Sequence, residues 1–137
     1  ELGYPTTTEQ MVTRLEAILS KPDYLTLVAV MNEQITGFIG AQVRPSYESD
    51  GLYGHILAFV VSRDARRRGV GRALIGTLES LLARRGITVV IVNTGNHRAD
   101  AHAFYDRAGY SFTGRRYRKI LPDRPGENRR HGCSHTR

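Results

Sequence analysis

The stretch between residues 54 and 93 constrains the fold more than any other part of the sequence. It opens with an apolar run, GHILAFVVS (54 to 62), typical of a strand in the middle of a sheet. Apolar side chains then recur at helical spacing and predict a helix from about 70 to 85. A second apolar run, ITVVIVN (87 to 93), completes a βαβ unit. The two strands of such a unit run parallel.

The residues before this unit predict a helix and a hairpin. Thr6 and Glu9 are spaced as in a capping box, and the apolar pattern that follows predicts a helix from about 8 to 20. Two β-rich runs, 24 to 31 and 35 to 43, are separated by a short polar turn. We therefore expect them to pair as antiparallel strands.

The residues after the unit predict one more helix and one more strand. The helix spans about 98 to 108 and stops at Gly109, and residues 110 to 120 alternate as in a strand. The order of elements predicts the α+β class. Its single mixed sheet is mostly antiparallel, with a central parallel pair of strands flanked by helices.

The positive charge of the chain is concentrated at its C-terminal end. The net charge is +7, but residues 1 to 114 carry 12 basic against 11 acidic side chains, while residues 115 to 137 carry 8 against 2. Two regions follow from this and from the loss of periodicity: a folded domain, 1 to 121, and a basic, disordered tail, 122 to 137. Because the domain itself is nearly balanced in charge, the sequence argues against a nucleic-acid-binding protein.

Several classes of protein find no support in the sequence. No apolar stretch reaches the roughly 18 residues of a membrane span, and the N-terminus lacks the features of a signal peptide. The expected location is therefore the cytoplasm. The run HGCSH (131 to 135) holds three soft ligands in a flexible end rather than in a tetrahedral cage, so we expect no metal site.

A glycine turn joins the first strand of the βαβ unit to its helix. In RRRGVG (66 to 71), Gly69 and Gly71 permit unusual φ angles and a close approach to the backbone. The helix N-terminus that follows offers unpaired N–H groups to a phosphate. Glycines that serve turn geometry alone remain the alternative. The stretch is neither a P-loop nor a dinucleotide fingerprint.

Two motifs, at their places in the predicted order of elements, resemble signatures of the GNAT superfamily of N-acetyltransferases. The run VVSRDARRRGVGRAL is similar to the acetyl-CoA signature of that family, and AFYDRAGY, some 35 residues later, is similar to its second signature. The resemblance covers about residues 1 to 121. The family's first strand has no counterpart in this sequence.

The resemblance implies acetyl-CoA as co-substrate and an acetyl transfer by direct attack in a ternary complex. The pyrophosphate would be bound by backbone amides of the glycine turn, and the pantetheine arm by the end of the preceding strand. The cofactor-binding residues that it implies are Phe59, Val60, Val61, Arg66, Arg67, Arg68, Gly69, Val70, Gly71, Arg72, Asn96 and Arg98.

The resemblance also implies three catalytic residues. The amide of Val61 would polarise the thioester carbonyl, as an acyl-transfer intermediate requires. Tyr105 would protonate the departing thiolate, since a phenol carries its proton at neutral pH. His55 stands where the family often has an acidic residue and is the candidate base. A packing or surface role is the alternative for this histidine.

The acceptor is expected to be a primary amine of a small molecule or peptide. Glu48 and Asp50, in the polar loop from 44 to 54, would attract a cationic amine, although carboxylates on such a loop are commonly only solvated. A homodimer is suggested by the family alone. The alternative function is a non-catalytic domain that binds CoA or a polyanion.

Overall fold

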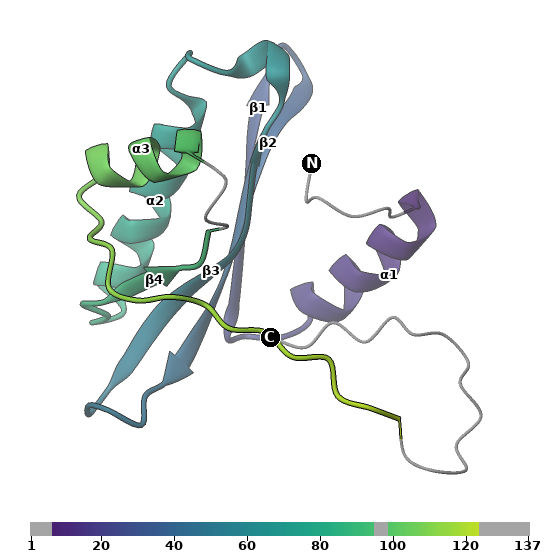
Figure 1. Cartoon of the computed structure of the whole chain (residues 1–137). Helices are drawn as coiled ribbons and strands as arrows, with labels where there is room; N and C mark the ends of the chain where they lie inside the picture. Colours follow the sequence, from purple (N-terminus) through teal and green to yellow (C-terminus); the bar gives the residue numbers. More distant parts are fainter. Residues whose placement is uncertain (1–6, 95–98, 124–137) are drawn as a thin grey trace.

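The computed structural model describes residues 7–94 and 99–123, which form a four-stranded sheet and three α-helices (Figure 1). This confirms the predicted α+β class with one mixed, mostly antiparallel sheet. The elements in chain order are α1 (Thr8–Leu19), β1 (Tyr24–Met31), β2 (Gln34–Pro45), β3 (Leu52–Val61), the 3-10 turn η1 (Arg63–Ala65), α2 (Val70–Arg84), β4 (Val90–Val92) and α3 (Ala99–Arg107).

Strands β1 and β2 form the predicted antiparallel hairpin. Asn32 and Glu33 connect them with φ angles of 51° and 63°, a backbone that suits the twist of two directly connected strands. β2 is longer than the predicted run of 35 to 43. It continues to Pro45 because its last residues still pair with β3.

Strands β3 and β4 run parallel, as the βαβ pattern predicts. β4 is much shorter than the predicted run of 87 to 93 and comprises three residues. Part of the difference lies at Ile87, which closes the end of α2 instead: its amide donates to the Leu82 carbonyl over 3.0 Å. Gly86, with φ of 80°, supplies the left-handed residue of that helix end.

The core lies between α2 and one face of the sheet. Helices α2 and α3 lie on this side, and α1 lies on the other (Figure 1). The contact is close, because a Cβ on Gly54 would lie 2.7 Å from Leu82 Cδ1. The buried apolar residues are Ile39, Ala41, Ile56, Ala65, Val70, Leu74, Ile75, Leu78, Leu82 and Ile87.

Helix α1 begins one residue later than the predicted capping box implies. Thr7 is the N-cap, its hydroxyl accepts from the Gln10 amide over 3.1 Å, and the Gln10 side chain accepts from the Thr7 amide over 3.0 Å. The predicted pair Thr6 and Glu9 is therefore wrong by one position. No residue of α1 is fully buried, so this helix covers its side of the sheet loosely.

The predicted strand from 110 to 120 is wrong. The described residues from 110 to 123 contain no strand, and those from 111 onward are exposed. Alternation of side chains cannot form a strand by itself, since a strand needs a neighbour to pair with. Most of the predicted tail lies outside the described residues.

Candidate functional site

Strands β3 and β4 pair over a short distance and then separate. Their parallel register runs from Gly54 with Val90 to Ile56 with Val92, and no further pair between them is found in the described residues. β3 continues to Val61. Over the last residues of β3, no strand among the described residues pairs with the edge that faces away from β2, and we call this unpaired stretch the exposed edge of β3.

The antiparallel ladder decides which amides point to this edge. The Ser62 amide donates to the Thr36 carbonyl over 2.8 Å. Because these two residues flank the facing pair of Gly37 and Val61, that pair is a non-hydrogen-bonded pair of the ladder. The N–H and C=O of Val61 therefore point away from β2. By the same alternation, so do those of Phe59, whereas Val60 faces β2.

The glycine turn places the N-terminus of α2 just beyond the end of β3. Arg67 and Gly69 both have left-handed backbone, with φ of 63° and 81°. Gly69 is the N-cap and has no side chain to cap the helix, and the first turn of α2 contains no acidic residue. The N–H groups of this turn and the helix dipole thus favour an anion.

Arginine side chains surround the turn. Arg66, Arg67, Arg68 and Arg72 are all exposed, and Arg66 Nε donates to the Val61 carbonyl over 3.3 Å. This bond ties the turn to the exposed edge of β3. A surface hollow lies beside it, lined by residues 35–38 and 60–63 together with Arg66.

Gly71 lies in the first turn of α2 and brings α3 close. A Cβ at this position would lie 3.4 Å from Phe104 Cε2 and 3.6 Å from Phe59 Cζ. The rings of Phe59 and Phe104 meet edge to face, with centroids 5.7 Å apart, and Tyr105 is 5.4 Å from Phe104 and 6.4 Å from Phe59. Tyr105 is thereby held against the strand that carries the exposed edge.

Tyr110 anchors the C-terminal end of α3 to α2. Its hydroxyl donates to Glu79 Oε2 over 2.8 Å, and its ring lies 5.6 Å from that of Tyr105. Burial, followed by the hydrogen bond to Glu79, raises the pKa of Tyr110 well above its ordinary value. Tyr110 is therefore a protonated structural anchor beside Tyr105.

His55 faces the opposite side of the sheet from the core because of a β-bulge in β3. Gly40 pairs with Ala58 and Ala41 with Ile56, so Leu57 is the extra residue. In a regular strand, residues 55 and 59 would lie on the same face. The bulge shifts this alternation, so Phe59 packs on the core side while His55 lies opposite Gln42 on the other face.

Both ring nitrogens of His55 have side-chain partners. Arg44 Nη1 lies 3.0 Å from Nδ1, and Asn93 Nδ2 lies 3.1 Å from Nε2. Arg44 comes from β2, and Asn93 follows β4 directly. His55 therefore links strands on both sides of β3, next to the point where β3 and β4 separate.

The contacts extend across the sheet to the start of β1. Arg44 Nε donates to Gln42 Oε1 over 2.7 Å, and Gln42 Nε2 donates to Asp23 Oδ2 over 2.9 Å. The Gln42 amide holds the pKa of Asp23 below its usual range. Arg44 Nη2 is buried and has no hydrogen-bond partner among the residues that the structure describes.

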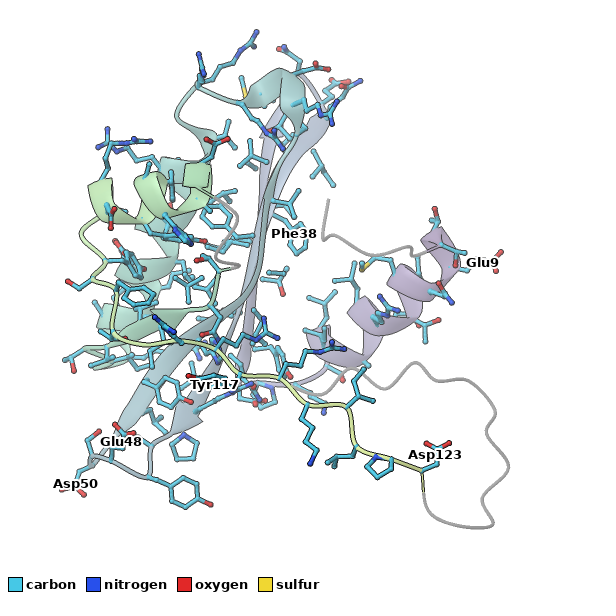
Figure 2. All side chains as sticks on the ribbon, in the orientation of Figure 1. Glu9, Phe38, Glu48, Asp50, Tyr117 and Asp123 are labelled. Atoms are coloured by element: carbon cyan, nitrogen blue, oxygen red, sulfur yellow. The ribbon has the colours of Figure 1, made fainter. Side chains whose placement is uncertain are left out.

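The structure brings most of the predicted residues to one end of β3. Phe59, Val61, the glycine turn and Tyr105 are neighbours there, whereas Asn96 and Arg98 lie outside the described residues. Glu48 and Asp50 lie at the β2–β3 connection, at the opposite end of β3 from the turn (Figure 2). The roles of all these residues stay predictions.

Sequence reasoning missed Gln42, Arg44 and Asn93. Gln42 and Arg44 are polar side chains two positions apart in a largely apolar strand, a spacing that puts them on the same face. That signal was visible in the sequence. Their partners were not, because the contacts depend on strand register and on the bulge.

Among residues 7–94 and 99–123, no helix is both long and apolar enough to cross a membrane. The same residues hold no group of three or more His, Cys, Asp or Glu side chains arranged to bind a metal. The run 131 to 135 lies outside them.

Residues 2–110 match the family model described as "Acetyltransferase (GNAT) family". The uncharacterized N-acetyltransferase YhdJ of Bacillus subtilis is 30% identical over 112 residues, which are 81% of this chain and 78% of YhdJ. The aminoalkylphosphonate N-acetyltransferase of Salmonella typhimurium is 28% identical over 77% of this chain and 68% of its own length.

A solved structure agrees with these sequence matches. A GNAT family acetyltransferase of Staphylococcus aureus superposes with a TM-score of 0.74 at 30% identity, and the match covers 88% of this chain and 82% of that one. The predicted resemblance is thereby confirmed.

Proposed function

We propose, since the chain belongs to the acetyltransferase (GNAT) family, that it transfers the acetyl group of acetyl-CoA to a primary amine in a ternary complex. Acetyl-CoA is the co-substrate of this family. One observation carries the proposal for this chain: the exposed edge of β3 ends beside the N-terminus of α2. A thioester arm along the edge would therefore place its phosphates at the helix.

The pyrophosphate of acetyl-CoA would lie on the turn from 67 to 72. The left-handed residues Arg67 and Gly69 shape this turn, and α2 directs its free N–H groups outward. Arg66, Arg68 and Arg72 would add positive charge around the phosphates, and Val70 and Gly71 would contribute amides of the first helical turn.

The thioester would lie along β3. The Val61 amide points to the exposed edge, so it can donate to the carbonyl oxygen as negative charge develops there. Phe59 presents its backbone at the same edge, and the neighbouring Val60 completes the strand segment beside the arm. The side chain of Val61 takes no part in this role.

The reaction would proceed by attack of the neutral amine on the thioester carbon. A C–N bond forms, the C–S bond breaks, and the thiolate receives the phenolic proton of Tyr105. The aromatic contacts of Tyr105 with Phe59 and Phe104 hold its ring near the strand. This fixed position supports its assignment as the acid.

The amine must also lose a proton, and His55 is the base that the sequence predicts. His55 lies six residues before Val61 on β3, about 20 Å along an extended strand. A water relay would have to carry the proton over part of this distance. Nδ1 would also have to be released by Arg44 before it could accept.

The position of the acidic loop limits which acceptors could contact its carboxylates. Glu48 and Asp50 precede β3, so the strand separates them from Val61 by about 30 Å. Only an extended molecule such as a peptide or a long polyamine could contact both the acidic loop and the thioester. A small amine would be selected by residues nearer the thioester. The relative from Salmonella typhimurium, named for aminoalkylphosphonates, supports including small anionic amines among the acceptors.

Two expectations about the setting of the protein remain predictions. The sequence predicts the cytoplasm as its location, and family resemblance predicts a homodimer. Light scattering of the purified protein with and without acetyl-CoA would test the second.

The test of the proposed function is release of free thiol from acetyl-CoA over a panel of amines. We expect turnover with at least one amine and a loss of kcat on the order of 10²-fold in Tyr105→Phe. The binding of CoA, measured by calorimetry, should stay unchanged in this variant. Tyr117→Phe is the matched control, because Tyr117 is 88% exposed.

Two results would contradict the proposal. Binding of CoA without turnover on any amine would favour the non-catalytic alternative. Equal kcat in the wild type and Tyr105→Phe would remove Tyr105 from the mechanism while leaving the acetyl transfer itself intact.

A further inference from the structure

The hydrogen bond between Arg44 and His55 determines where the imidazole carries its proton. A guanidinium has donors only, so Nδ1, 3.0 Å from Arg44 Nη1, must accept. A neutral imidazole that accepts at Nδ1 carries its proton on Nε2. His55 is therefore neutral in this arrangement, with the proton directed toward Asn93.

The contact with Asn93 is compatible with this tautomer. The side-chain amide of Asn93 lies 3.1 Å from Nε2, and a half-turn of the amide places its oxygen there without changing its shape. The oxygen then accepts from Nε2–H. The Arg44 donor thus decides the direction of the hydrogen bonds that the ring makes with Arg44 and Asn93.

The surroundings of Arg44 hold its guanidinium in place. Gln42 accepts from Nε over 2.7 Å and is itself bound to Asp23. On the side of β3, Tyr53 pairs with Arg44 across the strands, and its ring lies 6.4 Å from that of His55. Arg44 therefore fixes the ring of His55 relative to β2.

We propose that Arg44 is a positioning residue for His55, the candidate base: it selects the Nε2–H tautomer of the ring. Through this tautomer it fixes the contact between His55 and Asn93. That contact ties the end of β4 to β3 directly where the two strands separate. The consequence for catalysis rests on the proposed function, whereas the tautomer does not.

The tautomer can be measured by NMR of the protein labelled with ¹⁵N-histidine. The signals of His55 are identified by their absence in His55→Gln. We expect the neutral wild-type ring to show the Nε2–H pattern and Arg44→Met to show a mixture with Nδ1–H. Arg44→Lys, which keeps a donor, should restore the wild-type pattern. Arg84→Met, on exposed α2 surface, is the control.

Kinetics then test the consequence for the site. In Arg44→Met, the KM for the amine should rise about tenfold while the KM for acetyl-CoA stays within twofold, and Arg44→Lys should recover most of the loss. An equal change in both KM values would indicate general damage to the fold and would overturn the positioning role.

The spectra alone can also overturn the proposal. It is wrong if the wild-type ring shows Nδ1–H, or if Arg44→Met keeps the Nε2–H tautomer. Should Arg44→Met fail to fold, Asn93→Ala decides: retention of Nε2–H supports Arg44 as the determinant, and its loss assigns that role to Asn93. Absence of turnover with every amine would refute the proposed function and leave these spectral outcomes decisive.

Discussion

Gly37 lies where β2 passes the N-terminal part of α2, and at the scale of single residues its missing side chain is a packing requirement. A Cβ here would lie 2.9 Å from the Val60 carbonyl oxygen, 3.2 Å from Leu74 Cδ1 and 3.3 Å from Val70 Cγ1. The first of these atoms belongs to the backbone and cannot rotate away. We expect Gly37→Ala to lower the free energy of unfolding by about 1–3 kcal/mol, measured by urea denaturation.

Gly40 in the same strand provides the control for this substitution. A Cβ at Gly40 would meet no heavy atom of the described part of the chain within 4 Å. Gly40→Ala should change the free energy of unfolding by no more than about 0.5 kcal/mol. Equal destabilisation by the two substitutions would show that contact with Val60 is not the cause.

At the scale of elements, Gly71 couples the first turn of α2 to α3. Its neighbours are Phe104 and Phe59, so the methyl groups of valine would displace the aromatic cluster as well as the turn. We expect Gly71→Val to raise the Kd for acetyl-CoA at least tenfold, measured by calorimetry. Gly76 lies in the same helix, and a Cβ there would meet no described atom within 4 Å apart from the local helix backbone, so Gly76→Val should leave this Kd unchanged.

The arginines of the turn should matter less than its glycines. The exposed side chain of Arg67 would add charge to the proposed phosphate site, which backbone amides would form. Arg67→Ala should therefore weaken acetyl-CoA binding less than a bulky residue at Gly69 or Gly71, in the same calorimetric experiment. A larger effect of Arg67→Ala would mean that side-chain charge dominates.

Tyr110 links α3 to α2, and this contact should make the free energy of unfolding depend on pH in the alkaline range. Folding raises the pKa of Tyr110, first through burial and then through Glu79. The protonated phenol is therefore favoured in the folded state. Its stabilisation is complete below the unfolded pKa of about 10 and is lost as the pH rises above it.

The measurement compares urea midpoints from pH 8 to 11. The midpoint of the wild type should fall more steeply above about pH 10 than that of Tyr110→Phe, which has no phenol to ionise at this position. Parallel curves for the two proteins would show that Tyr110 makes no contribution of this kind.

At the scale of the whole molecule, the net charge divides the chain into two parts. Of the total of +7, residues 115 to 137 account for +6. Arg115, Arg116, Arg118 and Lys119 are exposed in the described part of this segment. We expect replacement of these four by glutamine to lower the salt concentration at which the protein elutes from heparin.

Measuring the affinity for acetyl-CoA in the fourfold variant shows whether the change in heparin binding also involves the proposed acetyl-CoA site. This affinity should be unchanged in the variant, because the proposed phosphate site lies at α2. Unaltered elution from heparin would show that these four side chains make no contribution to the binding of polyanions.

The sequence by itself determined the glycine turn and the order of the elements as far as α3. Helix α2 and the hairpin of β1 and β2 follow from side-chain periodicity and turn residues, which act over a few positions along the chain. The same local signals predicted the parallel relation of β3 and β4, since a βαβ connection admits few alternatives.

The tertiary structure alone decided which distant residues meet. The bulge at Leu57 turns His55 away from the core and toward Arg44 and Asn93. β4 is short, and residues 110 to 120 form no strand. The physical reason is common to all three: pairing and register depend on the neighbour that a strand finds in space, and a one-residue shift changes the face of every side chain beyond it.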